Sequence, residues 1–331
     1  MAALLSTAVA RAAAASCNGV AIGSFSPNPV SWRGSSTGYD PLDSTRYAQS
    51  VTFTVSKNTG PCTVIIGATV GDADSGTNRT LARGSNTLSF NLYTDSQLQN
   101  VWRNPPNATS NQVITYTFNS APPHQTATLT FYYNIPPQQL TSANMLVPTG
   151  TYSRQVTFYV YTGTLNNPGS AVSSTNVNFQ ASVQSDMQVS VVPQGQSFSL
   201  SSTSQTVTLQ TIDLQTAASG AVDLWVRANT GFKLQLASQN KGVMKYSANP
   251  ADPSTVPYTL SVKVDGTYTP VNLNNTATLS AASGATGLGG NDYPISIAVT
   301  NLANTTSFPT GQNLPLAGSY ADVVTITGIA Q

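Results

Sequence analysis

The sequence predicts an all-β protein made of two antiparallel β-sandwich domains. Short stretches of alternating apolar and polar residues run through the whole chain, whereas the periodicity of amphipathic helices is nearly absent. Clusters of Gly, Pro and Asn separate these stretches, which is typical of sandwiches with short connections. At 331 residues the chain is long enough for two domains that each bury a core.

The first domain is expected over residues 16–184. Its strands are defined by alternation, and its last two segments are a closing strand and one further strand that follows it. These segments lie at residues 51–55, 88–92, 114–118, 150–160 and 177–183.

The second domain is expected over residues 185–331, and it opens with a new strand at Met187. The turn at Asn229–Gly231 leads from one of its alternating segments to the next. The remaining strands follow the same period-two pattern. The expected strands lie at residues 187–192, 222–228, 232–236, 258–264, 295–299 and 323–329.

A short closing motif occurs in both halves of the chain. Gly150, Tyr152, Val156 and Thr157 of the first copy correspond to Gly318, Tyr320, Val324 and Thr325 of the second. The first copy is followed by a further strand-like segment, whereas the printed sequence ends soon after the second. We therefore expect the first domain to complete its own sheet and the second to lack its last strand, with Val324 and Ile326 on an edge that accepts a strand.

The composition excludes several classes of protein. Only 8% of residues are charged and the net charge is +1, so nothing favours binding to nucleic acid or to an anionic membrane. Hydrophobic residues, counted with Ala and Cys, make up 40% of the chain. Many of them alternate with polar residues, so they can bury enough apolar surface to offset the conformational entropy lost on folding. No later apolar run reaches the ~18 residues of a membrane-spanning helix.

The N-terminal segment and the cysteines indicate export. Residues 1–15 are rich in small apolar residues and offer several Ala-x-Ala cleavage sites without a basic start, so we expect the remnant of a secretory signal peptide. The alternative is an Ala-rich helix of the mature protein. Cys17 and Cys62 are the only cysteines, and in an exported chain such an isolated pair is expected to form one disulfide.

Catalytic and metal-binding patterns are not found. The only histidine, His124, lies in a Pro-rich loop. Asp72 and Asp74 lie two residues apart, but no Glu follows at the spacing of a calcium-binding loop. The sequence also offers no assignable pair of carboxylates for glycoside hydrolysis. We expect no enzyme activity, no metal and no cofactor.

Three apolar residues of the first domain fall outside the alternating stretches. Trp32 lies in an expected loop, and Met145 and Leu146 lie in the expected connection before the first closing strand. If exposed together, they would form an apolar patch that contacts a surface or ligand. The alternative is that these side chains fold back onto the sandwich.

Taken in order, several segments resemble spore coat protein U-like domains, the pilins of archaic (Csu-type) chaperone-usher pili. Two features depart from that resemblance: residues 140–147 lengthen a connection, and Arg103 stands where Gly is usual. The similar segments are Cys17, residues 23–25, Cys62, residues 88–95, 101–102, 135–138 and 150–152 in the first half, and 224–232, 256–260 and 317–324 in the second.

The resemblance implies immunoglobulin-like sandwiches, the second of which lacks its last strand and is completed by donor-strand complementation. The implied partners are a periplasmic pilus chaperone, the outer-membrane usher and the next pilin subunit, which donates a strand. The implied location is the pilus at the cell surface, after passage through the periplasm.

Within such a fibre the chain is expected at the tip. Only a few residues separate any expected cleavage site from Cys17, which leaves no free alternating segment to donate. We therefore expect a tip adhesin that mediates surface attachment and biofilm formation, through a ligand that the sequence does not identify. The alternatives are a non-tip structural pilin and a carbohydrate-binding β-sandwich protein.

Overall fold

The structure is a computed structural model that describes residues 17–34, 38–69, 79–119, 122–211, 216–279, 284–300 and 315–331. The expected signal-peptide remnant, residues 1–15, lies outside these ranges, as do Asp72 and Asp74. Over the described residues the chain is built of strands and contains no α-helix, with a single 3-10 turn at Ser110–Gln112. The all-β prediction is confirmed.

The chain divides into two compact units. The first comprises residues 1–39, 45–136 and 151–182, and the second comprises residues 40–44, 137–150 and 183–331. The main division falls between Ser182 and Val183, two residues from the expected boundary. The segments at 40–44 and 137–150, which we expected in the first domain, group with the second unit.

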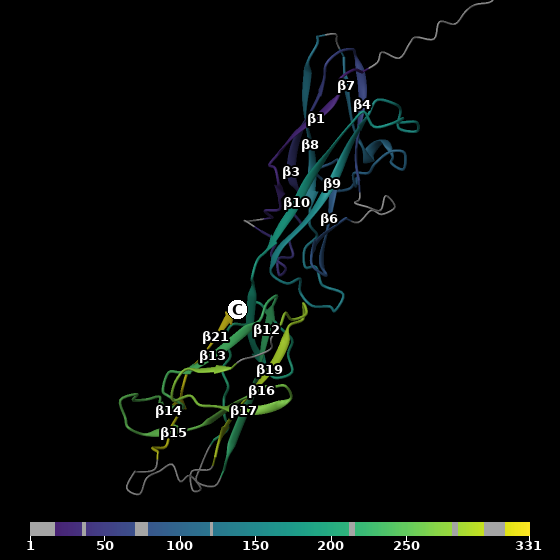
Figure 1. Ribbon diagram of the computed structural model, residues 1–331. Helices are drawn as coiled ribbons and strands as arrows, with labels where there is room; N and C mark the ends of the chain where they lie inside the picture. Colours follow the sequence, from purple (N-terminus) through teal and green to yellow (C-terminus); the bar gives the residue numbers. More distant parts are fainter. Residues whose placement is uncertain are drawn as a thin grey trace, which may run out of the picture. The chain divides into compact units, whose positions relative to one another are not determined.

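The first unit is a sandwich whose strands form one continuous paired path, β1-β3-β8-β6-β5-β9-β10-β2, with β4 joining β7 to β9 (Figure 1). The expected closing strand and its follower are β9 and β10, which are neighbours in this path. The strands are β1 (Ala21–Ser26), β2 (Val30–Ser31), β3 (Gln49–Lys57), β4 (Cys62–Ala68), β5 (Arg79–Arg83), β6 (Asn86–Tyr93), β7 (Ile114–Phe118), β8 (Gln125–Asn134), β9 (Gly150–Tyr161) and β10 (Ser173–Val183).

Aromatic side chains dominate the core of this unit. Trp102 is fully buried, and its ring centroid lies 5.1 Å from those of both Phe131 and Phe158. Its indole Nε1 donates to the Ile66 carbonyl at 2.9 Å, so the polar atom of the ring is satisfied inside the core. Buried aromatic rings on alternate strand positions are what the period-two pattern predicts.

A buried arginine lies beside this core. The Arg79 guanidinium donates to the carbonyl oxygens of Thr69 at 2.8 Å, Ala68 at 3.1 Å and Trp102 at 2.7 Å. Burial is the main cause that lowers its pKa to about 9. These bonds connect the start of β5 with the end of β4 and with the stretch after Val101.

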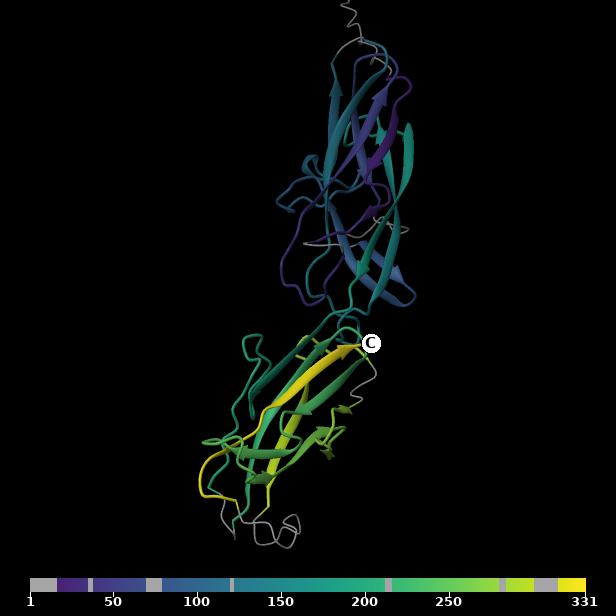
Figure 2. The same ribbon diagram turned by 90° about the vertical axis from the view of Figure 1, so that its left-hand side faces the viewer.

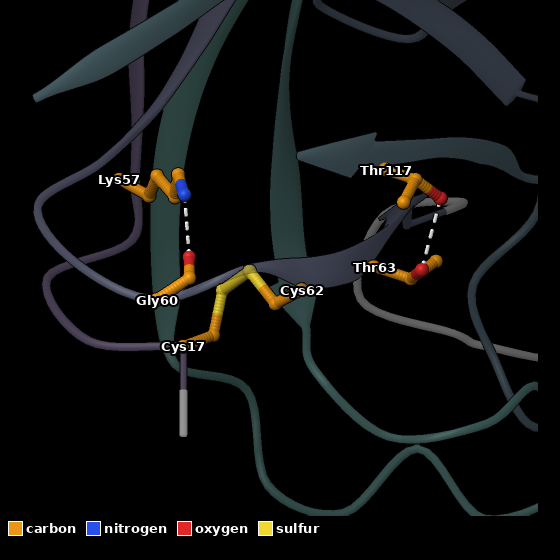
Figure 3. The surroundings of a disulfide bond; sticks show 6 residues. All are labelled: Cys17, Lys57, Gly60, Cys62, Thr63 and Thr117. Atoms are coloured by element: carbon orange, nitrogen blue, oxygen red, sulfur yellow. Dashed lines mark hydrogen bonds between the residues drawn. A yellow bond between two sulfur atoms is a disulfide. The ribbon is translucent and has the colours of Figure 1, made fainter. Parts of the chain in front are cut away.

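The expected Cys17–Cys62 disulfide is present, with the two Cα atoms 5.5 Å apart (Figure 3). It connects the first described residue of the chain to the start of β4. Beside it, the Lys57 ammonium donates to the Gly60 carbonyl at 2.5 Å, as Figure 3 shows. The two cysteines are 45 residues apart in the sequence. A disulfide that closes a loop of this length restricts the unfolded chain and raises the free energy of unfolding by roughly 3–4 kcal/mol.

The second unit contains two main sheets, β11-β12-β19-β16-β17 and β18-β13-β21, and a smaller one, β15-β14-β20. Figure 2 shows β21, in yellow, running across the front of this unit to the C-terminus. The strands are β11 (Met187–Pro193), β12 (Ala218–Ala228), β13 (Phe232–Ser238), β14 (Val243–Tyr246), β15 (Thr255–Pro257), β16 (Thr259–Val264), β17 (Thr267–Val271), β18 (Ala277–Leu279), β19 (Asn291–Val299), β20 (Tyr320–Ala321) and β21 (Val324–Ala330).

The core of the second unit is mainly aliphatic. The inward residues of β12 and β13 are buried between the two main sheets, together with residues of β16 and β19. Both units are therefore immunoglobulin-like sandwiches, as the sequence predicts. The buried residues of β12 and β13 are Val222, Leu224, Val226, Ala228, Phe232, Leu234 and Leu236.

Candidate functional site

The second unit has two edge strands that lie beside each other. Within the described part of the chain, β21 pairs only with β13, and β11 pairs only with β12. A turn covers β11 at one point, where the Val191 amide donates to the Ser202 carbonyl at 3.0 Å. The other edge, along β21, therefore presents a row of backbone donors and acceptors that can pair with an added strand.

The inward side chains of these two strands are only half-buried. Met187, Val189 and Val191 of β11 and Val324 and Ile326 of β21 all pack against the aliphatic core, yet each stays partly exposed. We call these five residues the apolar strip. Because the inward residues of β12 and β13 are fully covered, the core of this unit is open along the strip and closed elsewhere along those strands.

One end of the strip is fixed by the turn between β12 and β13. The Asn229 side chain accepts from the Asp186 amide at 2.9 Å and so holds the start of β11. The Gln331 amide donates to the Gly231 carbonyl at 2.7 Å, and the Thr230 hydroxyl donates to the Gln331 carbonyl at 2.6 Å. The same turn therefore holds both strands that border the strip.

The other end of β21 is fixed by Asp322. Its carboxylate accepts from the Ser238 hydroxyl at 2.5 Å, from the Tyr258 hydroxyl at 2.6 Å and from the Asn240 amide at 3.0 Å. Burial raises the pKa of Tyr258, and the bond to Asp322 raises it further. Tyr320, two residues earlier, donates to the Leu316 carbonyl at 2.8 Å, as the tyrosine corner of immunoglobulin-like domains does.

The first unit provides an internal comparison for this edge. By the shared closing motif, Val156, Phe158 and Val160 of β9 correspond to Val324, Ile326 and Gly328 of β21. In β9 these side chains are at most 1% exposed. The difference follows from β10, which lies beside β9 and buries Val177, Phe179 and Ala181. Within the described residues, β21 has no such neighbour on its outer side.

The residues expected to mark the strand-accepting edge, Val324 and Ile326, are on β21 and face the core. Within the described residues β21 is an edge strand, and that this edge accepts a strand stays a prediction. Pattern reasoning did not identify the partners of this edge on β11, nor the role of Asp322. The motif that contains Asp322 was visible, but alternation carries no information about polar side-chain contacts.

We expected Trp32, Met145 and Leu146 to form an exposed apolar patch, and this prediction is wrong for two of the three residues. Trp32 is 2% exposed, because the short strand β2 pairs with β10 and turns the ring edge-on to Tyr133 at 5.2 Å. Leu146 is 0% exposed, and its amide donates to the Thr286 carbonyl at 2.8 Å within the second unit. Met145 is half-buried.

The described residues contain no group of three His, Cys, Asp or Glu side chains that could hold a metal ion. In the same part of the chain, no helix is long and apolar enough to cross a membrane.

Residues 3–158 match the Spore Coat Protein U domain. The resemblance expected over the first half is thereby confirmed, and the matched residues of the Spore Coat Protein U domain end before the second unit's main segment begins at Val183. No curated protein matches the chain.

Three solved structures illustrate what the whole chain is similar to. The CsuC-CsuE chaperone-tip adhesion subunit complex of archaic Csu pili from Acinetobacter baumannii shares 13% identity over 90% of this chain and 96% of that chain, with a TM-score of 0.38. CfaE, the adhesive subunit of CFA/I fimbria of enterotoxigenic Escherichia coli, shares 11% over 92% and 93%, with a TM-score of 0.36. The CupB6 tip adhesin of Pseudomonas aeruginosa shares 11% over 95% of each chain, also at 0.36.

Burial of Leu146 and Trp32 predicts a large loss of stability on truncation. Leu146→Ala should lower the free energy of unfolding by about 2–5 kcal/mol and Trp32→Ala by about 3–5 kcal/mol, because each leaves a cavity. The matched control is Leu200→Ala, at a leucine that is 65% exposed, which should change it by less than about 0.5 kcal/mol. Urea unfolding of the full chain measures all three. Unchanged stability in the first two variants, with weaker adhesion to apolar surfaces, would restore the exposed patch.

Asp322→Asn should loosen the start of β21. The amide nitrogen cannot accept the hydroxyl bonds that the carboxylate accepts, so we expect a loss of about 1.5–3 kcal/mol in the free energy of unfolding. Asp265→Asn, at an exposed turn residue with φ 50°, is the matched control and should have little effect. Equal unfolding midpoints for the two variants would show that the Asp322 contacts do not hold the strand.

Proposed function

We propose that the chain is a subunit of a chaperone-usher pilus and that a β-strand from a partner completes its second unit. The observation that carries this proposal is the contrast between matched strands: the inward residues of β9 are buried beside β10, whereas those of β21 are half-buried beside an unpaired edge. A donated strand with alternating apolar side chains would pair with this edge and cover the apolar strip at the same time.

The proposed partners follow from this chemistry and from the resemblance of the sequence to archaic pilins. A periplasmic chaperone supplies the strand first, and the next pilin subunit replaces it during assembly at the outer-membrane usher. The chain is thereby exported through the periplasm to the cell surface. The fibre subunit has a binding and structural role, and no enzyme activity is part of the proposal.

We assign the chain to the fibre tip, as an adhesin for surface attachment and biofilm formation. Within the described residues every strand of the first unit, including β1 at its start, is paired inside that unit, so none is free to be donated.

Antibodies against the first unit should therefore label only the ends of assembled fibres in electron micrographs. Labelling along the fibre would identify a structural shaft subunit.

Strand complementation is tested by adding a flexible linker and an alternating segment of Ile and Thr after Gln331. The added strand should supply a hydrogen-bond ladder to β21 and cover the apolar strip, so the full chain should become monomeric and the melting temperature of its second unit should rise by several degrees or more. The matched control carries the same linker with Ser in place of every Ile. Equal melting temperatures for the two proteins would mean that the second unit needs no added strand.

A further inference from the structure

A glycine interrupts the inward row of β21. Val324, Ile326 and Gly328 alternate along the inner face, and at the position of Gly328 the matched strand β9 carries the fully buried Val160. The space that a side chain at Gly328 would need is already occupied. A Cβ atom built there would overlap the terminal methyl group of Met187 and lie 3.1 Å from its sulfur.

Met187 thus lies across the strip, from β11 onto the backbone of β21. The same Cβ atom would lie 2.9 Å from Cγ2 of Val189, so the thioether and the valine together cover the bare backbone at Gly328. A glycine inside a strand often marks a place where another group approaches the backbone closely. Here that group is a side chain of the chain itself.

The backbone is held in place at both Met187 and Gly328, whereas the Met187 side chain that joins them is only half-buried. The Met187 amide donates to the Asp186 carboxylate at 2.7 Å, and Asp186 is itself held by Asn229. The end of β21 is held by the Gln331 bond to Gly231. Met187 is only half-buried, and an unbranched thioether with three rotatable bonds changes conformation at low cost.

We propose that Met187 is a displaceable plug. In the strand-free protein it fills the place over Gly328 that an apolar side chain of the incoming strand takes when the strand binds, and it swings aside on binding. The inference rests on the proposed function and adds a specificity rule: the strand should carry a branched apolar residue opposite Gly328, where the missing side chain of β21 leaves room for it.

Methyl NMR of the full chain tests this directly, because the sequence contains four methionines, Met1, Met145, Met187 and Met244. The chain is labelled at the methionine methyl groups, and Met187→Leu assigns the relevant signal. Two forms of the added C-terminal strand are compared, one with Ile and one with Gly opposite Gly328. The Ile form should shift the Met187 signal and narrow it to that of a mobile side chain, whereas the Gly form should leave it in place. Met244, on β14, should not respond to either strand.

Stability measurements distinguish a plug from an ordinary core residue. Met187→Ala should lower the melting temperature of the strand-free chain by about 3 °C and leave that of the Ile-strand form almost unchanged. Met244→Ala, the matched control, should lower both alike. Two outcomes would contradict the role of Met187 and leave the proposed function intact. One is an equal loss of melting temperature on Met187→Ala in the strand-free and Ile-strand proteins. The other is an unchanged Met187 methyl signal although the added strand stabilises the chain. An added strand that gives no stabilisation would overturn the proposed function itself.

Discussion

A β-strand with a single neighbour satisfies only about half of its backbone hydrogen-bonding groups, and the organisation of the second unit depends on this constraint at β21. The outer edge of β21 is unpaired within the described residues, and its inward residues are half-buried. Each neighbouring feature has a role relative to that edge. The β12–β13 turn holds its end, Asp322 holds its start, and Met187 covers the one position where the strand has no side chain.

The two units show how one closing motif leads to two outcomes. A Gly-x-Tyr sequence opens β9 and shortly precedes β21, and both strands turn alternate side chains inward, so the local sequence does not decide whether these side chains are buried. The decision comes from the next strand: β10 lies beside β9 and covers the core of the first unit. The aromatic core of the first unit is fully covered along β9 and β10. The aliphatic core of the second unit is left open along the apolar strip.

The strands and the open edge could be predicted because both depend on local period-two alternation and on an internal repeat. The burial of Trp32 could not, because it follows from the two-residue strand β2, which pairs in parallel with β10 about 150 positions away in the chain. The prediction that Leu146 is exposed was wrong for the same reason, because its amide donates to the carbonyl of Thr286, which is far away in the sequence. Asp322 was part of a recognisable motif, yet its hydroxyl partners on β13 and β16 come together only in the fold.

An open edge of this composition is a hazard that the chain does little to reduce. Natural edge strands are protected by lysines, prolines or bulges, but β21 contains neither a charged residue nor a proline between Val324 and Ala330. Its flanking and outward residues add apolar exposure, with Val323 58% and Ile329 39% exposed. Such a segment pairs readily with any available strand. With only 8% charged residues in the chain, electrostatic repulsion offers little protection, so a dedicated partner strand is the physically consistent way to keep this edge from aggregating.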